Sequence, residues 1–310
     1  MSDPNLLPEP SACITSPYAM NAPPISNPLP EDMFEVAKLW QDVFHDSDDY
    51  VELFFNRVYK PENTLVIKRD DHIISALQMI PYTVKLHERI VRAAYLCGLC
   101  TLPSEQGRGY MKKLIHDAMR QLQKRGDGLA FVIPAEPSLF NFYRKLGFTS
   151  PVNQTTETRF FDDYIINVWD RNCPYTFETC TSEYFTYFDR KQQELDKTIL
   201  HDASDFETIL QELKIDEGQA FVALDHQTPV GMALAKKCSP NTVLLKTLFA
   251  DSLIINTVLQ IHACRLFDAK YVKIILPEAP EKESTPYGLA CIIDNQYYNL
   301  NNLFLSLMLD

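Results

Sequence analysis

Apolar residues alternate between helical and strand spacing along the first half of the chain. Over 33–44 they recur every three or four positions, which predicts a helix with one buried face. Over 64–68 a run of apolar residues predicts a strand. In chain order, the predicted elements are helices over 33–44 and 48–59, strands over 64–68, 73–86 and 90–102, a helix over 110–124, a strand over 129–133, a helix over 138–146 and a strand over 154–161.

The second half repeats this order of elements. We interpret the repeat as a diverged internal duplication, with a mixed sheet and flanking helices in each half. Its predicted elements are a helical region over 182–214, a strand pair over 220–224 and 230–235, a strand over 243–248, a helix over 253–267, a strand over 271–277 and two last strands over 287–293 and 303–309.

Composition indicates a folded protein of about two domains. The chain has 310 residues, of which 46% are hydrophobic and 23% charged. Residues 1–30 contain 8 of the 20 prolines and show no periodicity, so we expect an extended tail there. The chain shows no secretory signal and no apolar run of membrane-spanning length, so we expect no membrane partner and a cytoplasmic location.

Net charge narrows the choice of partners. At −12, with a pI near 5.1, the chain lacks the clustered basic residues that phosphate backbones require, so we expect no nucleic-acid partner. Acidity favours a cationic or amine-bearing small substrate, although most acidic chains are simply soluble. Whether the chain forms a homo-oligomer stays open.

The chain contains 8 cysteines, and only Cys97 and Cys100 form a CxxC pair. This pair lies within the predicted strand over 90–102, where positions three apart face opposite sides. We therefore expect buried reduced thiols and no metal site.

The stretch SEQGRGYMKKL, residues 104–114, places two of the 9 glycines between a predicted strand and a predicted helix. Such a turn lets the backbone approach a ligand, and the unpaired amides of the first helical turn form an anion site. The alternative is an ordinary tight turn. The pattern is neither a dinucleotide-binding fingerprint nor a Walker loop, because the third glycine and the Gly-Lys-Ser/Thr are missing.

Two motifs together resemble the GNAT acetyltransferase superfamily. Residues 106–111, QGRGYM, resemble that family's Q/R-x-x-G-x-G/A signature, with Met111 where Gly or Ala is usual. Residues 141–148, NFYRKLGF, are similar to its Y-x-K-x-GF motif. The resemblance covers roughly residues 30–161. It implies an α+β (α/β) fold of two GNAT-like domains, each with a mixed, largely antiparallel sheet flanked by helices. It divides the chain into a tail (1–30), a catalytic domain (31–164) and a degenerate GNAT-like domain (165–310).

The resemblance also implies a co-substrate, acetyl-CoA, and the residues that bind it. The backbone of the strand before the turn would pair with the pantetheine arm, and the amides of the turn would hold the pyrophosphate, with a charge-assisted bond from Arg108. Asn141 would reach the pantetheine. The implied cofactor-binding residues are Leu99, Cys100, Thr101, Gln106, Gly107, Arg108, Gly109, Tyr110, Met111 and Asn141.

Acyl transfer to an amine needs a proton donor for the departing thiolate and an acceptor for the amine's proton. Tyr143 is the candidate general acid, and its alternative interpretation is a core aromatic residue. Glu136 is the candidate base, and its alternative interpretation is a solvated loop carboxylate. In two-domain relatives such as the enhanced intracellular survival acetyltransferases the chain terminus reaches the active site, which makes the Asp310 carboxylate a further candidate base.

These observations leave three functions open. The first is an acyl-CoA-dependent N-acyltransferase that acts on a small-molecule or peptide amine, with no metal. The second is a non-catalytic acyl-CoA or small-ligand binding module, and the third an aminoacyl-tRNA-dependent transferase, which the acidic charge argues against. The acceptor is not identified by the sequence, and its pocket is expected from the segments 48–62 and 80–92.

Overall fold

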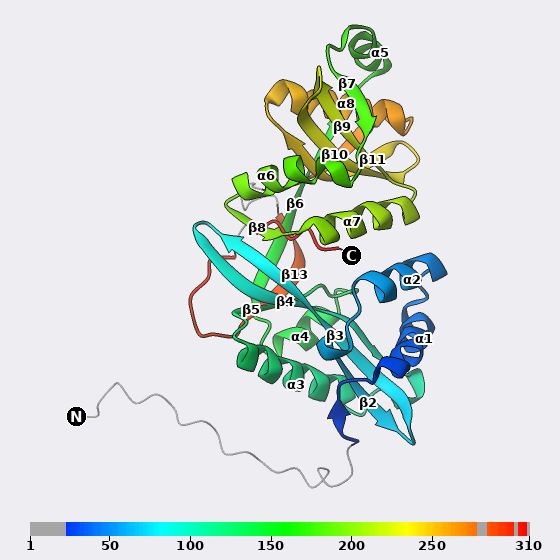
Figure 1. Ribbon diagram of the computed structural model, residues 1–310, viewed down its shortest axis with the longest axis vertical. Coiled ribbons are helices and arrows are strands. Elements are labelled where there is room, and N and C mark those ends of the chain that lie inside the picture. Colours follow the sequence, from blue (N-terminus) through cyan, green and yellow to red (C-terminus); the bar gives the residue numbers. More distant parts are fainter. Residues whose placement is uncertain (1–22, 278–283, 301–302, 309–310) are drawn as a thin grey trace, which may run out of the picture.

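One continuous sheet runs through the whole molecule. The structure, a computed structural model, describes residues 23–277, 284–300 and 303–308. Figure 1 shows the two halves stacked along the long axis, with helices α6 and α7 of the second half lying between its sheet and the first half. The predicted tail lies mostly outside the described residues, but its last part adds a short edge strand, since Ile25 pairs with Ile67.

The first half follows the predicted order of elements. Predicted and observed boundaries agree most closely for the first helix, whose amphipathic stripe buries Val36, Leu39 and Trp40. The elements are β1 (Ile25–Ser26), α1 (Met33–Phe44), α2 (Asp48–Arg57), β2 (Thr64–Arg69), β3 (His72–Leu86), β4 (Arg89–Thr101), α3 (Tyr110–Arg125), β5 (Leu129–Val132), α4 (Leu139–Arg144) and β6 (Ser150–Phe160).

The second half departs from the prediction in three places. The helical region over 182–214 is wrong as one unit, because β8 interrupts it and pairs with β3. A helix and a strand, α5 and β7, were not predicted. The predicted strand over 303–309 is wrong within the described residues, where Phe304 forms a single bridge to Thr198. The elements are α5 (Asp163–Asn172), β7 (Thr176–Thr179), α6 (Phe185–Glu194), β8 (Lys197–Leu200), α7 (Ala203–Ile215), β9 (Gln219–Asp225), β10 (Thr228–Ser239), β11 (Thr242–Ala250), α8 (Leu253–Leu266), β12 (Tyr271–Leu276) and β13 (Ser284–Ile292).

Strand order confirms the mixed, largely antiparallel fold and shows how the halves are joined. The order is β1-β2-β3-β4-β5-β13-β6-β12-β11-β10-β9-β7, with β8 beside β3. Among the strands of the described residues, only β4–β5 and β11–β12 are parallel pairs, one in each half. Each pair is connected through a helix, α3 or α8. Strand β13, late in the chain, lies between β5 and β6, while β6 pairs with β12. Each half thus takes a strand from the other.

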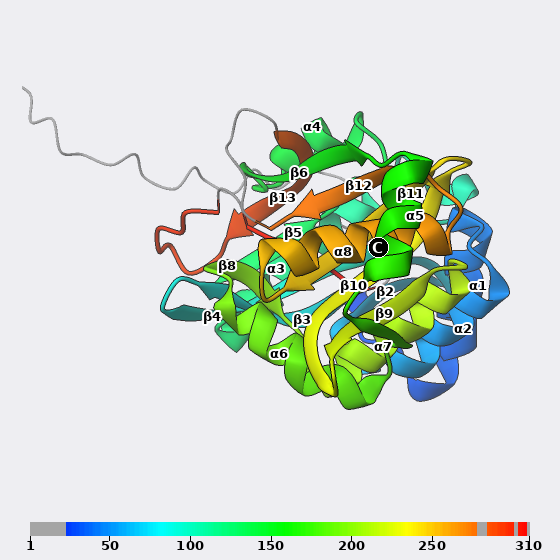
Figure 2. The same cartoon turned by 90° about the horizontal axis from the view of Figure 1, so that it is seen from above.

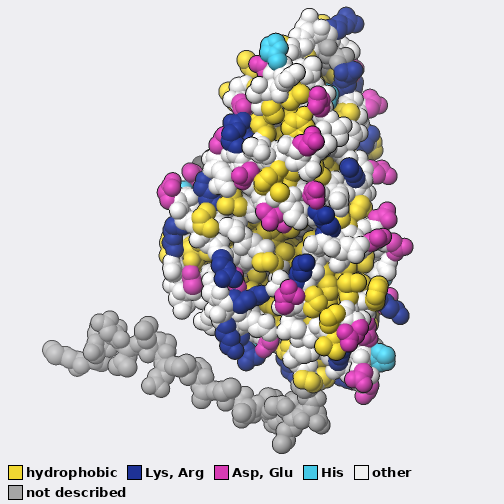
Figure 3. Space-filling view, in the orientation of Figure 1, with side chains coloured by type: hydrophobic (Ala, Val, Ile, Leu, Met, Phe, Trp, Pro, Cys, Tyr) yellow, Lys and Arg dark blue, Asp and Glu magenta, His cyan; other side chains and the backbone are white. Residues whose placement is uncertain are grey.

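Helices cover both faces of the sheet in each half (Figure 2). In the first half, α1 and α2 bury one face in a core that also takes in the segment 303–308. The helix α3 and Tyr143 of α4 bury the other face. In the second half, α8 covers one face, and α6 and α7 cover the other. Figure 3 shows Lys and Arg interspersed with Asp and Glu over the face it presents.

A β-bulge in β4 corrects the expectation for the cysteine pair. Ala76 and Gln78 of β3 pair with Cys100 and Cys97, so β4 carries one extra residue. The extra residue cancels one step of the alternation. Both thiols therefore face the same core, contrary to the prediction that they face opposite sides. Burial raises the pKa of the Cys100 thiol to about 12.

Gly98 makes the bulge possible for two reasons. Its φ of +55° lies in the left-handed region. A Cβ on Gly98 would also lie 2.2 Å from the indole ring of Trp40 and 2.2 Å from Oε1 of Gln78. The Gln78 side chain is buried, and neither of its polar atoms has a hydrogen-bond partner among the described residues. The indole and the amide thus pack directly on the bare backbone of the bulge.

Gly98→Ala should lower the free energy of unfolding by about 2–5 kcal/mol, the sum of left-handed strain and overpacking. Gly126→Ala is the matched control, because Gly126 has φ +77° but open space around its Cβ. It should cost only the backbone strain, about 1–2 kcal/mol. Urea denaturation followed by circular dichroism measures both, and equal costs would show that the Trp40 contact is irrelevant.

Candidate functional site

The bulge lies where the sheet of the first half opens. Strand β4 pairs with β5 only from Ala93 to Tyr95, and the two strands separate beyond that point. Two cavities, of about 590 Å³ and 360 Å³, occupy this region. Leu99, Leu139 and Tyr143 line both of them, so the cavities meet at the opening.

The larger cavity contains the glycine turn. Gly107 and Gly109 have φ of +75° and +78°, and a Cβ on either would meet nothing within 4 Å. Gly109 caps α3, and the first amide to bond back, that of Lys113, reaches the Gly109 carbonyl at 3.2 Å. The preceding amides of the helix start beside the cavity, where a helix N-terminus favours an anion. The turn has the geometry expected of a phosphate site.

A network of charged side chains holds the glycine turn in place. Arg69 Nη1 donates to Glu105 Oε1 at 2.6 Å, and its Nη2 donates to the hydroxyl of Tyr110. Arg108, about half exposed, lies 3.5 Å from the same carboxylate. Arg69 therefore offsets a carboxylate next to the anion site and fixes the first residue of α3. Arg69 could not be predicted from the sequence, because it is 36 residues from Glu105.

Tyr143 lies where the two cavities meet. Its side chain is buried, and its ring packs edge-on against Phe142 and Phe148. Burial raises the pKa of the Tyr143 phenol to about 12. The phenol is protonated at neutral pH, and its raised pKa makes it a weaker acid than an exposed tyrosine.

Comparison with known proteins bears on this half of the molecule. Residues 25–150 match the family model described as an acetyltransferase (GNAT) domain. This segment is therefore similar to a GNAT domain. No curated protein matches the sequence significantly.

Solved structures share the arrangement of most of the chain, beyond this segment. A GCN5-related N-acetyltransferase from Anabaena variabilis superposes with a TM-score of 0.69 at 15% identity, over 87% of this chain and 72% of the other. A probable N-acyltransferase from Enterococcus faecalis gives 0.66 at 14% identity, over 88% and 73%. Saccharomyces cerevisiae N-myristoyltransferase with bound myristoyl-CoA gives 0.55 at 11% identity, over 92% and 85%. At these identities the likeness is one of fold.

Most residues expected to bind the co-substrate line the larger cavity. These are Leu99, Thr101, Gln106, Gly107, Gly109, Tyr110 and Met111. Gln106 Nε2 also donates to the Thr101 carbonyl at 3.2 Å, which fixes the turn to the end of β4. The Cys100 side chain points into the core on the other face of the sheet, so only its backbone is available.

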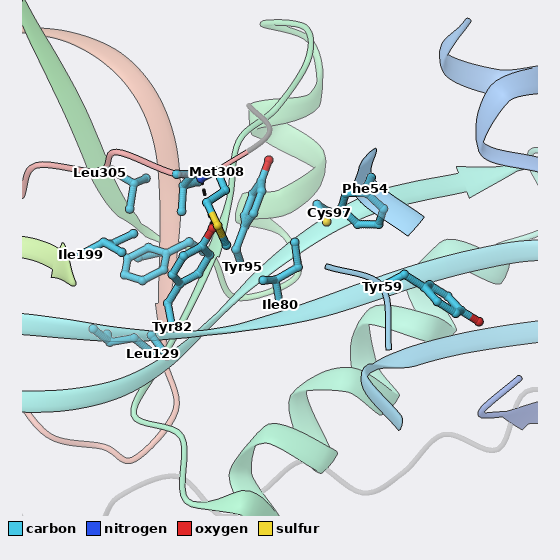
Figure 4. Close-up of a cluster of buried hydrophobic side chains, with 14 of the residues drawn as sticks. Phe54, Tyr59, Ile80, Tyr82, Tyr95, Cys97, Leu129, Ile199, Leu305 and Met308 are labelled. Atoms are coloured by element: carbon cyan, nitrogen blue, oxygen red, sulfur yellow. Dashed lines mark hydrogen bonds between the residues drawn. The ribbon is translucent and has the colours of Figure 1, made fainter. Parts of the chain in front are cut away.

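Three expected residues, Arg108, Asn141 and Glu136, do not line either cavity. Asn141 is on the exposed side of α4, with its Oδ1 3.4 Å from Nη1 of Arg144, and does not line either cavity. Glu136 is exposed and accepts from the Ser138 hydroxyl at 3.3 Å, also outside both linings. Asp310 lies outside the described residues. Met308 lies in the core, where its backbone amide donates a hydrogen bond to the Tyr82 hydroxyl at 3.1 Å (Figure 4).

The smaller cavity was missed by sequence reasoning. Of the expected acceptor segments, 48–62 contributes Tyr50 and 80–92 contributes nothing. The cavity is built instead around the α1–α2 connection. There, Nε1 of Trp40 donates to Oδ2 of Asp46 at 2.7 Å.

Two further features of the described residues bear on function. They contain no group of three or more metal-ligating side chains. None of their helices is long and apolar enough to span a bilayer.

The Tyr143 pKa predicts a pH dependence of stability. Because the folded-state pKa is about 12 and the ordinary value about 10, the folded state binds this proton more tightly. Its contribution is complete below about pH 10 and is lost as the pH rises towards 12. The free energy of unfolding should therefore fall more steeply above about pH 10 in the natural protein than in Tyr143→Phe.

Urea denaturation at several alkaline pH values measures this difference. Tyr164→Phe is the control, because Tyr164 is exposed and should leave the slope unchanged. Equal slopes in the natural protein and Tyr143→Phe would mean that the phenol is solvated.

Proposed function

We propose that this protein is an acyl-CoA-dependent N-acyltransferase that moves an acetyl group from acetyl-CoA to an amine. One observation carries the proposal. The left-handed Gly107 and Gly109 leave the N-terminus of α3 open to a cavity, and that cavity reaches the buried, protonated Tyr143 where β4 and β5 separate. The match of residues 25–150 to the GNAT family model supports it. The acceptor would be a small-molecule or peptide amine.

The co-substrate would bind along the larger cavity. The amides of Gly107 to Met111 would hold the pyrophosphate at the wall of this cavity. Arg108 does not line the cavity, but its half-exposed side chain would add a charge-assisted bond. The open edge of β4 at Leu99 would pair with the pantetheine arm as one strand pairs with another. This arrangement would bring the thioester to Tyr143.

Direct transfer then follows from these positions. The lone pair of the neutral amine attacks the thioester carbonyl carbon, forming a C–N bond, and the C–S bond breaks as the tetrahedral intermediate collapses. The departing sulfur takes the Tyr143 proton. The nitrogen gives up one proton, which restores the phenol, so the products are an N-acetyl amide and CoA. The amine must lose its ammonium proton to solvent before it attacks, because an alkylammonium has a pKa near 10.4.

A non-catalytic acyl-CoA-binding module is the alternative, and one observation favours it. Glu136, the expected base, lies outside both cavities. Binding of acetyl-CoA without thiol release in the presence of any amine would support this alternative.

Calorimetry with acetyl-CoA tests the binding half of the proposal. Gly109→Ala should weaken binding roughly tenfold, since the new methyl group enters the cavity beside the amides. Gly126→Ala is the matched control, with the same left-handed backbone and the same open space at the other end of α3. Equal affinities in the two variants would place the diphosphate elsewhere.

Thiol release from acetyl-CoA with a pool of amines tests the catalytic half. Tyr143→Phe should lower turnover about tenfold or more, because the thiolate loses its proton donor. The affinity for acetyl-CoA should stay within about a factor of two, since the ring remains. Unchanged turnover would remove Tyr143 from the mechanism.

A further inference from the structure

The cavity of about 360 Å³ lies on the far side of Tyr143 from the glycine turn. The proposed function requires an acceptor site there but does not say which amine fits it. We propose that this cavity selects a primary amine carried on a single flat, apolar ring system, with Asp46 as its counter-charge. The inference rests on the proposed function for its chemistry and on the cavity for its selectivity.

Five of the thirteen residues that line the cavity are aromatic. Trp40, Phe44 and Tyr50 come from α1 and α2, Tyr95 from β4 and Tyr143 from α4. Flat rings of this kind favour a flat ligand, and their faces also attract a cation.

The indole of Trp40 is fixed in place. It packs on the ring of Phe54 with centroids 4.5 Å apart and lies against the bare backbone of Gly98. Figure 4 shows Tyr95 and Cys97 on the same side of β4, with Phe54 beyond them. The Trp40 part of the wall is therefore held by the core before a ligand binds.

Asp46 is the only formally charged side chain that lines this cavity among the described residues. It is half-buried, and its Oδ2 is held by Nε1 of Trp40. This bond orients the carboxylate and leaves Oδ1 to accept from an ammonium. One carboxylate balances one ammonium. The further charges of a polyamine would face apolar walls, and burying an unpaired charge is costly.

The size of the cavity agrees with this chemistry. Its volume is at the lower end of the range for small-ligand sites, so one ring system with a short amine arm would fill most of it. Such an amine would lie between Asp46 and Tyr143, with its ring against Trp40 and Tyr95.

The first test compares acceptors by thiol release at saturating acetyl-CoA. 2-Phenylethylamine should give a kcat/KM about tenfold or more above those of n-butylamine and spermidine. Asp46→Asn should lower kcat/KM for 2-phenylethylamine roughly tenfold or more, while the amide oxygen still accepts from Trp40. Asp42→Asn is the matched control, since Asp42 is exposed on α1 outside the cavity, and it should change nothing.

The second test measures binding without turnover. The chain has two tryptophans, so Trp169→Phe leaves Trp40 as the sole tryptophan in the cavity wall. Titration of the CoA-loaded Trp169→Phe protein with 2-phenylethylamine should change Trp40 emission saturably. Adding Asp46→Asn should weaken that binding roughly tenfold, and adding Asp42→Asn should not.

The outcomes separate the two proposals. If acetyl-CoA is consumed but spermidine or n-butylamine serves as well as 2-phenylethylamine, or Asp46→Asn has no effect, the inference is overturned and the transferase stands. If no amine releases thiol, the transferase fails and the titration alone decides. Saturable emission change that depends on Asp46 then supports the amine site, and its absence overturns it.

Discussion

The contact between the indole of Trp40 and the backbone of Gly98 is the constraint on which the site depends. It holds a left-handed residue inside β4, and the resulting bulge marks the point beyond which β4 leaves β5. Without that separation the sheet would close, and the two cavities would have no common boundary at Tyr143. One helix–sheet contact therefore positions the glycine turn on one side and the aromatic cavity on the other.

The exchange of β6 and β13 between the halves also bears on the separation of β4 from β5. Strand β5 has only a short pairing with β4, and its other edge pairs with β13 over Leu129–Val132. Strand β13 thus holds β5 in the sheet where β4 no longer pairs with it. The Arg57–Glu207 ion pair, 2.7 Å long, adds a contact between α2 and α7 across the same boundary. The second half therefore acts on the site through the sheet and α2.

The predictable part of the structure was the part encoded by local sequence. The helix over 33–44 was predicted because its period of 3.6 is uninterrupted, and the turn at residues 107 and 109 because glycine spacing is visible in the chain. The bulge was missed because the indole that packs on it, that of Trp40, is 58 positions from Gly98 in the sequence. Non-local pairing likewise hid β8 and the place of β13. Asp46 gave no signal, because an Asp just before a helix usually serves as part of the helix start.

The crossed strands have a consequence for how the molecule is made. A nascent chain emerges in order, and β5 cannot acquire its second neighbour until residues 284–292 have left the ribosome. Until then, the first half presents an unpaired strand edge and apolar surface to the cell, which is the condition under which intermediates aggregate or recruit chaperones. The first half therefore cannot finish folding until the second half has been synthesised. Slower translation of the last codons would prolong the exposure of the unpaired edge.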